Sequence, residues 1–204
     1  MGWSDCLLCI DVKAENEEKI LHTARTMIAS YGDSVSVREI AIKSGLSHPA
    51  LRKRWKTRGD LFAAVHESIN ADLKEALGKE PVNETLPVFL IKALFALKTV
   101  QDAAGYYSYR FMPTFPEVAE NNPLLERLVS ACERYLKDNP NLQDKYGPLF
   151  SEADVLAAAI FSLLIAFSPA RLTRVCQAVD MSAGVEEQLP IMFLNSLTAF
   201  LSAK

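Results

Sequence analysis

One segment in the first third of the chain constrains the fold more than any other, because it contains the start and stop signals of two short helices. Ser36 and Glu39 have the spacing of a capping box, in which each side chain satisfies a backbone N–H group at a helix start. Gly45 can adopt the left-handed conformation that ends that helix. Ser47 then stands at the N-cap position of a second helix, and Pro49 falls in its first turn, where a missing N–H costs nothing. We therefore predict two short helices joined by a tight turn.

Apolar residues recur at helical spacing along nearly the whole chain, which predicts an all-α protein. One helix is expected over 17–31, before the turn, with its apolar stripe ending at Tyr31. The pair Thr57 and Asp60 also has capping-box spacing and predicts a helix that continues through Leu73. The remaining predicted helices lie near 83–99, 101–111, 123–138, 151–167 and 185–202, with a short one after Pro169.

The predicted organisation is an N-terminal three-helix helix-turn-helix domain followed by a second helical domain. The composition changes after "GKEP", and prolines punctuate the sequence from there on. We place an N-terminal tail at 1–16, the helix-turn-helix domain at 17–77 and the second domain at 78–204. The chain has 204 residues, half of them hydrophobic, so it is long enough to bury a substantial core.

Positive charge is concentrated in one part of a slightly acidic chain. Between residues 36 and 58 there are seven Lys and Arg residues and one acid, a net charge of +6. The rest of the chain has 15 cations and 24 acids, a net charge of −9, so the total is −3. A local basic surface on an acidic protein indicates a polyanionic partner that one region alone contacts.

The second short helix is expected to present this charge outward. Leu51 and Trp55 are four residues apart and can share one buried face. The residues that then face outward, or flank the outer face, are Pro49, Ala50, Arg52, Lys53 and Lys56. We predict a basic rod over 48–56 that fits the major groove of duplex DNA. A solvated helix face without a ligand is the simpler alternative.

Residues 17–65 resemble the N-terminal domain of the tetracycline-repressor (TetR) family of bacterial transcription regulators. The resemblance rests on the apolar stripe that ends in an aromatic residue and Gly32, and on "SVREIAIKSGLS". It also rests on the short helix with Leu51 and an aromatic residue at 55, and on "DLFAAV". It covers about a quarter of the chain closely, and the helical remainder is compatible in length and layout.

The resemblance implies roles for individual residues. Ser36 and Arg38 are expected to contact phosphate at the start of one helix, and Arg58 at the start of another. By resemblance, His48 is expected near base edges with Pro49 and Ala50. The alternative is that His48 is a surface residue without a role in binding. The full predicted DNA-binding set is Ser36, Arg38, Ser47, His48, Pro49, Ala50, Arg52, Lys53, Lys56 and Arg58.

Two positions depart from the family pattern. Position 52 is commonly Tyr in the family and position 54 is often aromatic or His, whereas both are Arg in this chain. Arginine can bind phosphate in bidentate fashion, so binding is expected to survive the change. An operator preference transferred from the family is therefore doubtful, and Arg52 and Arg54 are expected to raise non-specific affinity and salt sensitivity.

The second domain contains two helices that fit a dimer interface. The run 155–167 is apolar almost all round, and 185–202 has a wide apolar stripe. In the resembled family the last two long helices form a four-helix interface between two copies. We therefore expect a homodimer through the helices near 151–167 and 185–202, with an ordinary monomer core as the alternative.

Aromatic residues concentrate in "GYYSYRFMPTF" and nearby helices. Such a set can line an apolar pocket with a few polar groups, suited to a partly apolar small-molecule effector. Core packing is the simpler alternative for each residue taken singly. The effector-pocket candidates are Phe89, Phe95, Tyr106, Tyr109, Arg110, Phe111, Phe115, Tyr135 and Phe161.

No motif in the sequence indicates an enzyme, a metal site or a cofactor. The three histidines lack the spacing of metal ligands or of a nucleophilic triad, and no glycine-rich phosphate loop occurs. No apolar run is long enough to span a membrane and no secretion signal is evident, so a cytoplasmic protein is expected. Cys6 and Cys9 form a C-x-x-C pair that is read as free thiols first and as a redox pair second.

The sequence therefore predicts a ligand-responsive transcription regulator, a repressor that binds a palindromic operator as a homodimer. The second domain would bind the effector and form the dimer. Two alternatives stay open. One is a nucleoid-associated or protein-recruiting factor on the same scaffold, and the other is a redox-responsive regulator that uses cysteine.

Overall fold

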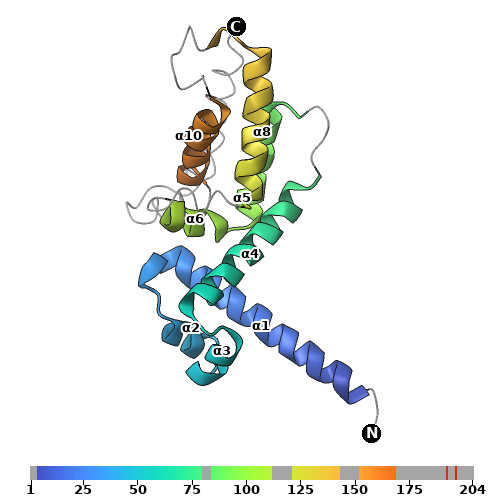
Figure 1. Cartoon of the computed structure of the whole chain (residues 1–204), viewed down its shortest axis with the longest axis vertical. Helices are drawn as coiled ribbons and strands as arrows, with labels where there is room; N and C mark the ends of the chain where they lie inside the picture. The colour runs from blue at the N-terminus through green and yellow to red at the C-terminus, as the bar shows by residue number, and fades with distance from the viewer. Residues whose placement is uncertain are drawn as a thin grey trace. The chain divides into compact units, whose positions relative to one another are not determined.

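A computed structural model describes residues 4–79, 84–111, 121–142 and 152–168, together with Met192 and Ser196. In this described part all regular secondary structure is helical, which confirms the all-α prediction for it (Figure 1). The chain divides into two compact units, Met1–Ile69 and Asn70–Lys204. None of the helices over these residues has both the length and the apolar character needed to cross a membrane.

The first unit combines one long helix, α1, with short helices around an apolar core. Its elements are α1 (Ser4–Tyr31), the 3-10 turn η1 (Gly32–Ser34), α2 (Val37–Lys43), α3 (His48–Arg54) and the beginning of α4 (Arg58–Leu77). α2 packs against α1 and α3 packs against α2. The core side chains include Ile20, Ala24, Met27, Ile28, Val35, Ile40, Ala41, Leu51, Trp55, Leu61, Phe62, Val65 and Ile69.

The first helix begins earlier than predicted and ends at Tyr31, as predicted. It begins at Ser4 rather than at residue 17, because no proline or glycine between residues 4 and 31 interrupts it. Tyr31 was placed on the buried stripe, but its side chain is exposed. The reason is that the helix ends at Tyr31, and Gly32 turns the chain away with a φ of +61°.

The second unit contains α5 (Leu86–Thr99), α6 (Ala103–Phe111), α8 (Pro123–Asp138) and α10 (Ala153–Ala166). α8 packs against α5 and α10, and α10 also packs against α6 (Figure 1). These helices occur where the sequence predicted them, with ends that differ by a few residues. The helices predicted after Pro169 and over 185–202 lie outside the described residues, apart from helical Met192 and Ser196.

The division into units falls inside α4, between Ile69 and Asn70. The predicted domain boundary, between 77 and 78, coincides with the end of this helix. Gly78 follows it with a φ of +63°, a conformation that suits a helix C-terminus and is strained for other residues. The assignment of 78–204 as an independent domain stays a prediction.

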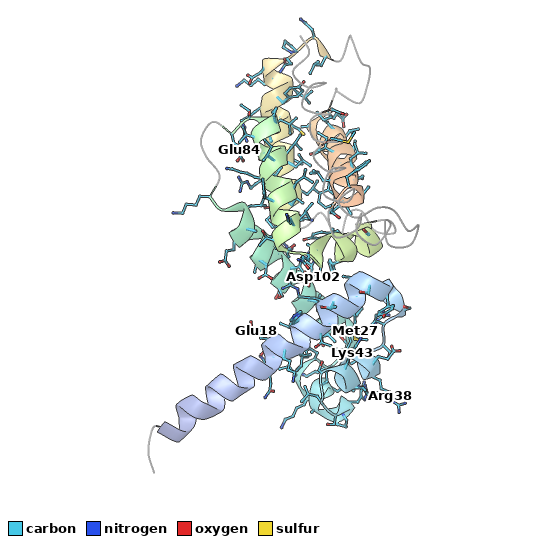
Figure 2. All side chains as sticks on the ribbon, turned by 180° about the vertical axis from the view of Figure 1, so that it is seen from behind. Glu18, Met27, Arg38, Lys43, Glu84 and Asp102 are labelled. Atoms are coloured by element: carbon cyan, nitrogen blue, oxygen red, sulfur yellow. The ribbon has the colours of Figure 1, made fainter. Side chains whose placement is uncertain are left out.

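A buried carboxylate organises one end of the second unit. The side chain of Glu84, which Figure 2 labels, is 1% exposed. Its carboxylate accepts hydrogen bonds from Lys92 Nζ at 2.5 Å and from an Arg127 guanidinium nitrogen at 2.7 Å. Arg127 also donates to the carbonyl oxygens of Leu77 and Gly78, at 3.0 and 2.9 Å. One arginine on α8 therefore joins the C-terminal end of α4 to the residue that precedes α5.

The charged cluster makes the second unit sensitive to acid. Burial alone would raise the pKa of Glu84, but hydrogen bonds from Lys92 and Arg127 outweigh it and hold the pKa below its ordinary value. A carboxylate with a lowered pKa in the folded state stabilises the fold above its unfolded pKa, and this contribution is lost as the pH falls through the folded pKa.

We therefore expect the wild type to be more stable than Glu84→Gln, with the largest difference near neutral pH. It should begin to shrink as the pH falls below about 4.3, the ordinary glutamate value. Thermal unfolding of both proteins between pH 7 and pH 3, followed by circular dichroism, measures the difference. Parallel pH profiles for the two proteins would contradict the expectation.

Candidate nucleic-acid interface

The first turn of α2 is fixed by the predicted capping box. The backbone N–H of Glu39 donates to Ser36 Oγ at 3.2 Å, and the Glu39 carboxylate accepts from the Ser36 N–H at 2.8 Å. The Ser36 hydroxyl also donates to this carboxylate, at 2.7 Å, and these bonds lower the pKa of Glu39. Because the single hydroxyl proton of Ser36 goes to Glu39, a DNA phosphate would compete with Glu39 for it.

The turn between α2 and α3 depends on Gly45. Its φ of +74° is the left-handed conformation that was predicted for it. A side chain at this position would meet no atom within 4 Å, so the backbone conformation, and not lack of space, is what favours glycine. The Leu46 N–H donates to the carbonyl of the fully buried Ala41 at 2.9 Å, which closes the turn.

α3 begins as predicted but ends earlier. Ser47 caps it, accepting from the Ala50 N–H at 3.3 Å, and Leu51 is buried beneath it. Helical conformation was predicted to continue to residue 56, but it stops at Arg54, and Trp55 is extended with φ −116° and ψ 109°. Trp55 is nevertheless buried, with 7% exposure. Lys56 is exposed, as predicted. The prediction rested on helical spacing, however, and Lys56 does not lie in the helix.

The capping of α4 limits how far α3 can extend. The Thr57 N–H donates to Asp60 Oδ2 at 2.9 Å, and the Asp60 N–H donates to Thr57 Oγ1 at 3.1 Å. This is the capping box predicted for the pair, and an N-cap residue has non-helical backbone angles. The chain must therefore leave the helical conformation before Thr57.

The predicted DNA-binding residues all belong to the first unit and lie between the start of α2 and the start of α4. His48 is half-buried, and the other members of the set are exposed, including Arg38, which Figure 2 labels. Arg58, the first residue of α4, has its guanidinium carbon 4.6 Å from the centre of the Phe62 ring, a cation–π contact. Their surface is therefore accessible in the single chain.

One acid that the sequence analysis did not single out lies beside this surface. Glu17 on α1 forms a hydrogen-bonded ion pair with Arg54 at the end of α3. The two residues are 37 positions apart, so no local sequence pattern connects them. Arg54 is thus engaged with an acid of its own chain.

The aromatic candidates of the second unit occupy different environments. Phe89, Tyr106 and Phe161 are fully buried, and Tyr135 is half-buried. Phe95 is 65% exposed, so it does not belong to the enclosed group. The side chains of the other four candidates, Tyr109, Arg110, Phe111 and Phe115, lie outside the described residues.

Tyr107, which was not among the candidates, joins the buried aromatic residues to polar ones. Its ring makes edge contacts with Tyr106 and Phe161, at centroid distances of 5.5 and 5.8 Å. Its hydroxyl donates to the Asn70 side-chain carbonyl, and the Asn70 amide donates to the Asn121 carbonyl at 2.8 Å. A buried tyrosine that finds a polar partner leaves no sequence signal, because the partner comes from a different helix.

The helix predicted for one half of the dimer interface keeps apolar side chains on two sides. Leu156, Ile160 and Leu164 are among its buried residues, whereas Val155 and Leu163 are exposed. For the other half, residues 185–202, the described part is limited to Met192 and Ser196, both exposed.

The described residues bear on only part of the cysteine and metal predictions. Burial raises the pKa of Cys132 to about 12, with a further contribution from the nearby Glu133, so its thiol stays protonated at neutral pH. The side chains of Cys6, Cys9 and Cys176 lie outside the described residues. Over the part that the structure describes, no three His, Cys, Asp or Glu residues are grouped to hold a metal ion.

Comparison with known proteins adds no assignment. A scan against protein-family models found no matching family, and a search of curated proteins found no matching protein.

Proposed function

We propose that the chain is a DNA-binding transcription regulator of the TetR type, in which α2 and α3 form a helix-turn-helix. The observation that carries the proposal is the surface of α3. Leu51 and Trp55 are buried on one side, whereas Arg52 and Lys53 are exposed on a helix that contains no acid. A helix anchored on one side and cationic on the other matches the requirements of the major groove.

The surrounding residues suit the phosphate backbone. Arg38 in the first turn of α2 and Arg58 at the start of α4 are exposed cations at helix N-termini, where backbone N–H groups also favour anions. Phosphate contacts of this kind set the register, and residues at the beginning of α3 then reach the base edges. In the proposed complex Pro49 and Ala50 are closest to the bases.

The second unit is proposed to bind an effector and to form a homodimer. The exposed apolar side chains of Val155 and Leu163 on α10 favour a partner helix, which a second copy would supply. The effector is proposed to be partly apolar, because several aromatic side chains, Tyr107 and Phe161 among them, gather in this unit. The effector would shift the balance between two arrangements of the reading helices by its differential affinity for them.

Genome-wide footprinting of the purified protein tests the proposal. Discrete two-fold symmetric sites near promoters, with changes in the adjacent transcripts after gene deletion, are the expected result. Broad coverage without transcript changes would favour the nucleoid-associated alternative. Absence of binding to any duplex in dilute buffer would overturn both readings.

Lys53→Ala is expected to weaken binding to duplex DNA without changing the melting temperature, because Lys53 is exposed and its side chain points away from the core. The slope of log K against log salt should fall in magnitude by about 0.9, the value for one phosphate contact. Lys74→Ala, which removes an exposed lysine from the second unit, is the matched control and should leave the slope unchanged. Wild-type affinity and slope in Lys53→Ala would remove Lys53 from the contact set.

A further inference from the structure

The ion pair between Glu17 and Arg54 changes the charge of the proposed DNA-binding surface. Residues 47–58 contain five cations and no acid, so the sequence alone gives this segment a charge of +5. The fold brings in one acid from α1, and Arg54 faces that acid at the C-terminal end of α3. Among the described residues, the neighbouring Arg52 and Lys53 have no such acidic partner.

The ion pair between Glu17 and Arg54 is partly exposed to solvent, so we expect it to affect DNA binding more than the stability of the fold. The side chains of Arg54 and Glu17 are 48% and 30% exposed. Solvent screens ion pairs of this kind, and they contribute little to stability. The same exposure leaves Arg54 within reach of an approaching polyanion, so Glu17 and a phosphate are competitors for one guanidinium group.

We propose that Glu17 holds Arg54 out of the phosphate-contacting set and thereby limits the affinity of the chain for DNA of arbitrary sequence. The inference rests on the proposed DNA-binding function. Glu17 acts in two ways: it accepts a hydrogen bond from one terminal nitrogen of Arg54, and its own negative charge repels nearby phosphates. Because contacts to phosphate carry no sequence information, removing one of them raises the share of binding energy that depends on the bases.

This assigns different roles to the two arginines that depart from the family pattern. Arg52 is exposed on α3 and remains a phosphate contact. Arg54 links the end of α3 to α1 through Glu17. In this role Arg54 does not contribute to the salt dependence of DNA binding. Glu17 is thus a specificity-determining residue that lies outside the helix-turn-helix segment itself.

The test uses the full chain and a random-sequence DNA duplex over a series of salt concentrations. Glu17→Gln frees Arg54 while keeping the size of the side chain. We expect it to bind tighter in dilute buffer by several-fold, with a salt slope steeper by about 0.9, equivalent to one more phosphate contact. Arg54→Gln and the double variant Glu17→Gln/Arg54→Gln should both keep the wild-type slope.

Glu18→Gln is the matched control, because Glu18 is an exposed acid next to Glu17 on the same helix (Figure 2). It removes the same formal charge without releasing Arg54, and its slope should equal that of the wild type. Thermal unfolding of every variant verifies that the fold is retained.

Three results would overturn the inference. A slope reduced by about 0.9 in Arg54→Gln would show that Arg54 already contacts phosphate. An unchanged slope in Glu17→Gln would show that the pair does not restrain Arg54. Equal effects of Glu17→Gln and Glu18→Gln would assign the change to net charge. If no protein, including the wild type, binds the duplex in dilute buffer, the proposed function itself fails, and that outcome is distinct from the other three.

Discussion

Trp55→Ala should lower the free energy of unfolding by about 3–5 kcal/mol, the usual loss when a large buried aromatic side chain is truncated. Trp55 is 7% exposed and follows the helix that carries the buried Leu51, so its removal leaves a cavity under the C-terminal end of α3. The residue lies outside the helix, and the loss therefore reflects packing and not helix propensity. Chemical denaturation followed by circular dichroism measures it.

Trp55→Phe is the matched control for this prediction. It keeps an apolar ring at the site and should lose clearly less stability than the alanine variant. An unchanged melting temperature in Trp55→Ala would show that the indole does not support the core. DNA affinity should fall together with stability in the alanine variant, because α3 is held in place by the side chains buried beneath it.

Arg127→Met is expected to destabilise the second unit by about 3 kcal/mol, since it removes the less exposed of the two cations that pair with Glu84 and leaves part-buried acceptors without their donor. The Glu84 carboxylate would retain one cationic partner, Lys92. The carbonyl oxygens of Leu77 and Gly78 would lose their donor at the end of α4, and Phe89 would lose the guanidinium that lies over its ring. Methionine keeps much of the apolar volume of the arginine side chain. The loss of stability therefore reflects the missing charge and hydrogen bonds of Arg127.

Lys92→Met provides the comparison on the same carboxylate. Lys92 is 37% exposed, whereas Arg127 is 11% exposed and makes more contacts, so the lysine variant should lose less stability. Adding Glu84→Gln to Arg127→Met should recover part of the loss, because the buried charge is then removed. Equal losses in Lys92→Met and Arg127→Met, measured by urea denaturation, would contradict the central position given to Arg127.

Much of the first unit follows from short-range patterns in the sequence. The Ser36–Glu39 and Thr57–Asp60 capping boxes, the Ser47 cap and the left-handed Gly45 all occur as predicted. Each of these features depends on atoms three or four residues apart, so the residue types at fixed spacing already specify the interaction. Leu51 is buried as helical spacing predicts, whereas Trp55 is buried although it lies beyond the end of α3.

The errors arose where local signals compete. Helical spacing alone extended α3 to residue 56, whereas α3 ends at Arg54 and Trp55 is extended, before the Thr57–Asp60 cap of α4 begins. Apolar periodicity placed Tyr31 in the core, but the turn at Gly32 leaves it exposed. Phe95 was grouped with the pocket candidates by residue type, whereas its position on α5 leaves it largely exposed.

Apart from the start of α1 and the end of α3, the sequence by itself determined where the described helices lie, how α2, α3 and α4 start, and which segment carries the positive charge. Only the tertiary structure decided which distant groups meet: Glu17 with Arg54, Glu84 with Arg127, and Asn70 with Tyr107. The partners in these pairs are separated by 37, 43 and 37 positions, respectively. Capping and helical periodicity act within a few residues along the chain, whereas an ion pair between helices exists only after the helices have packed.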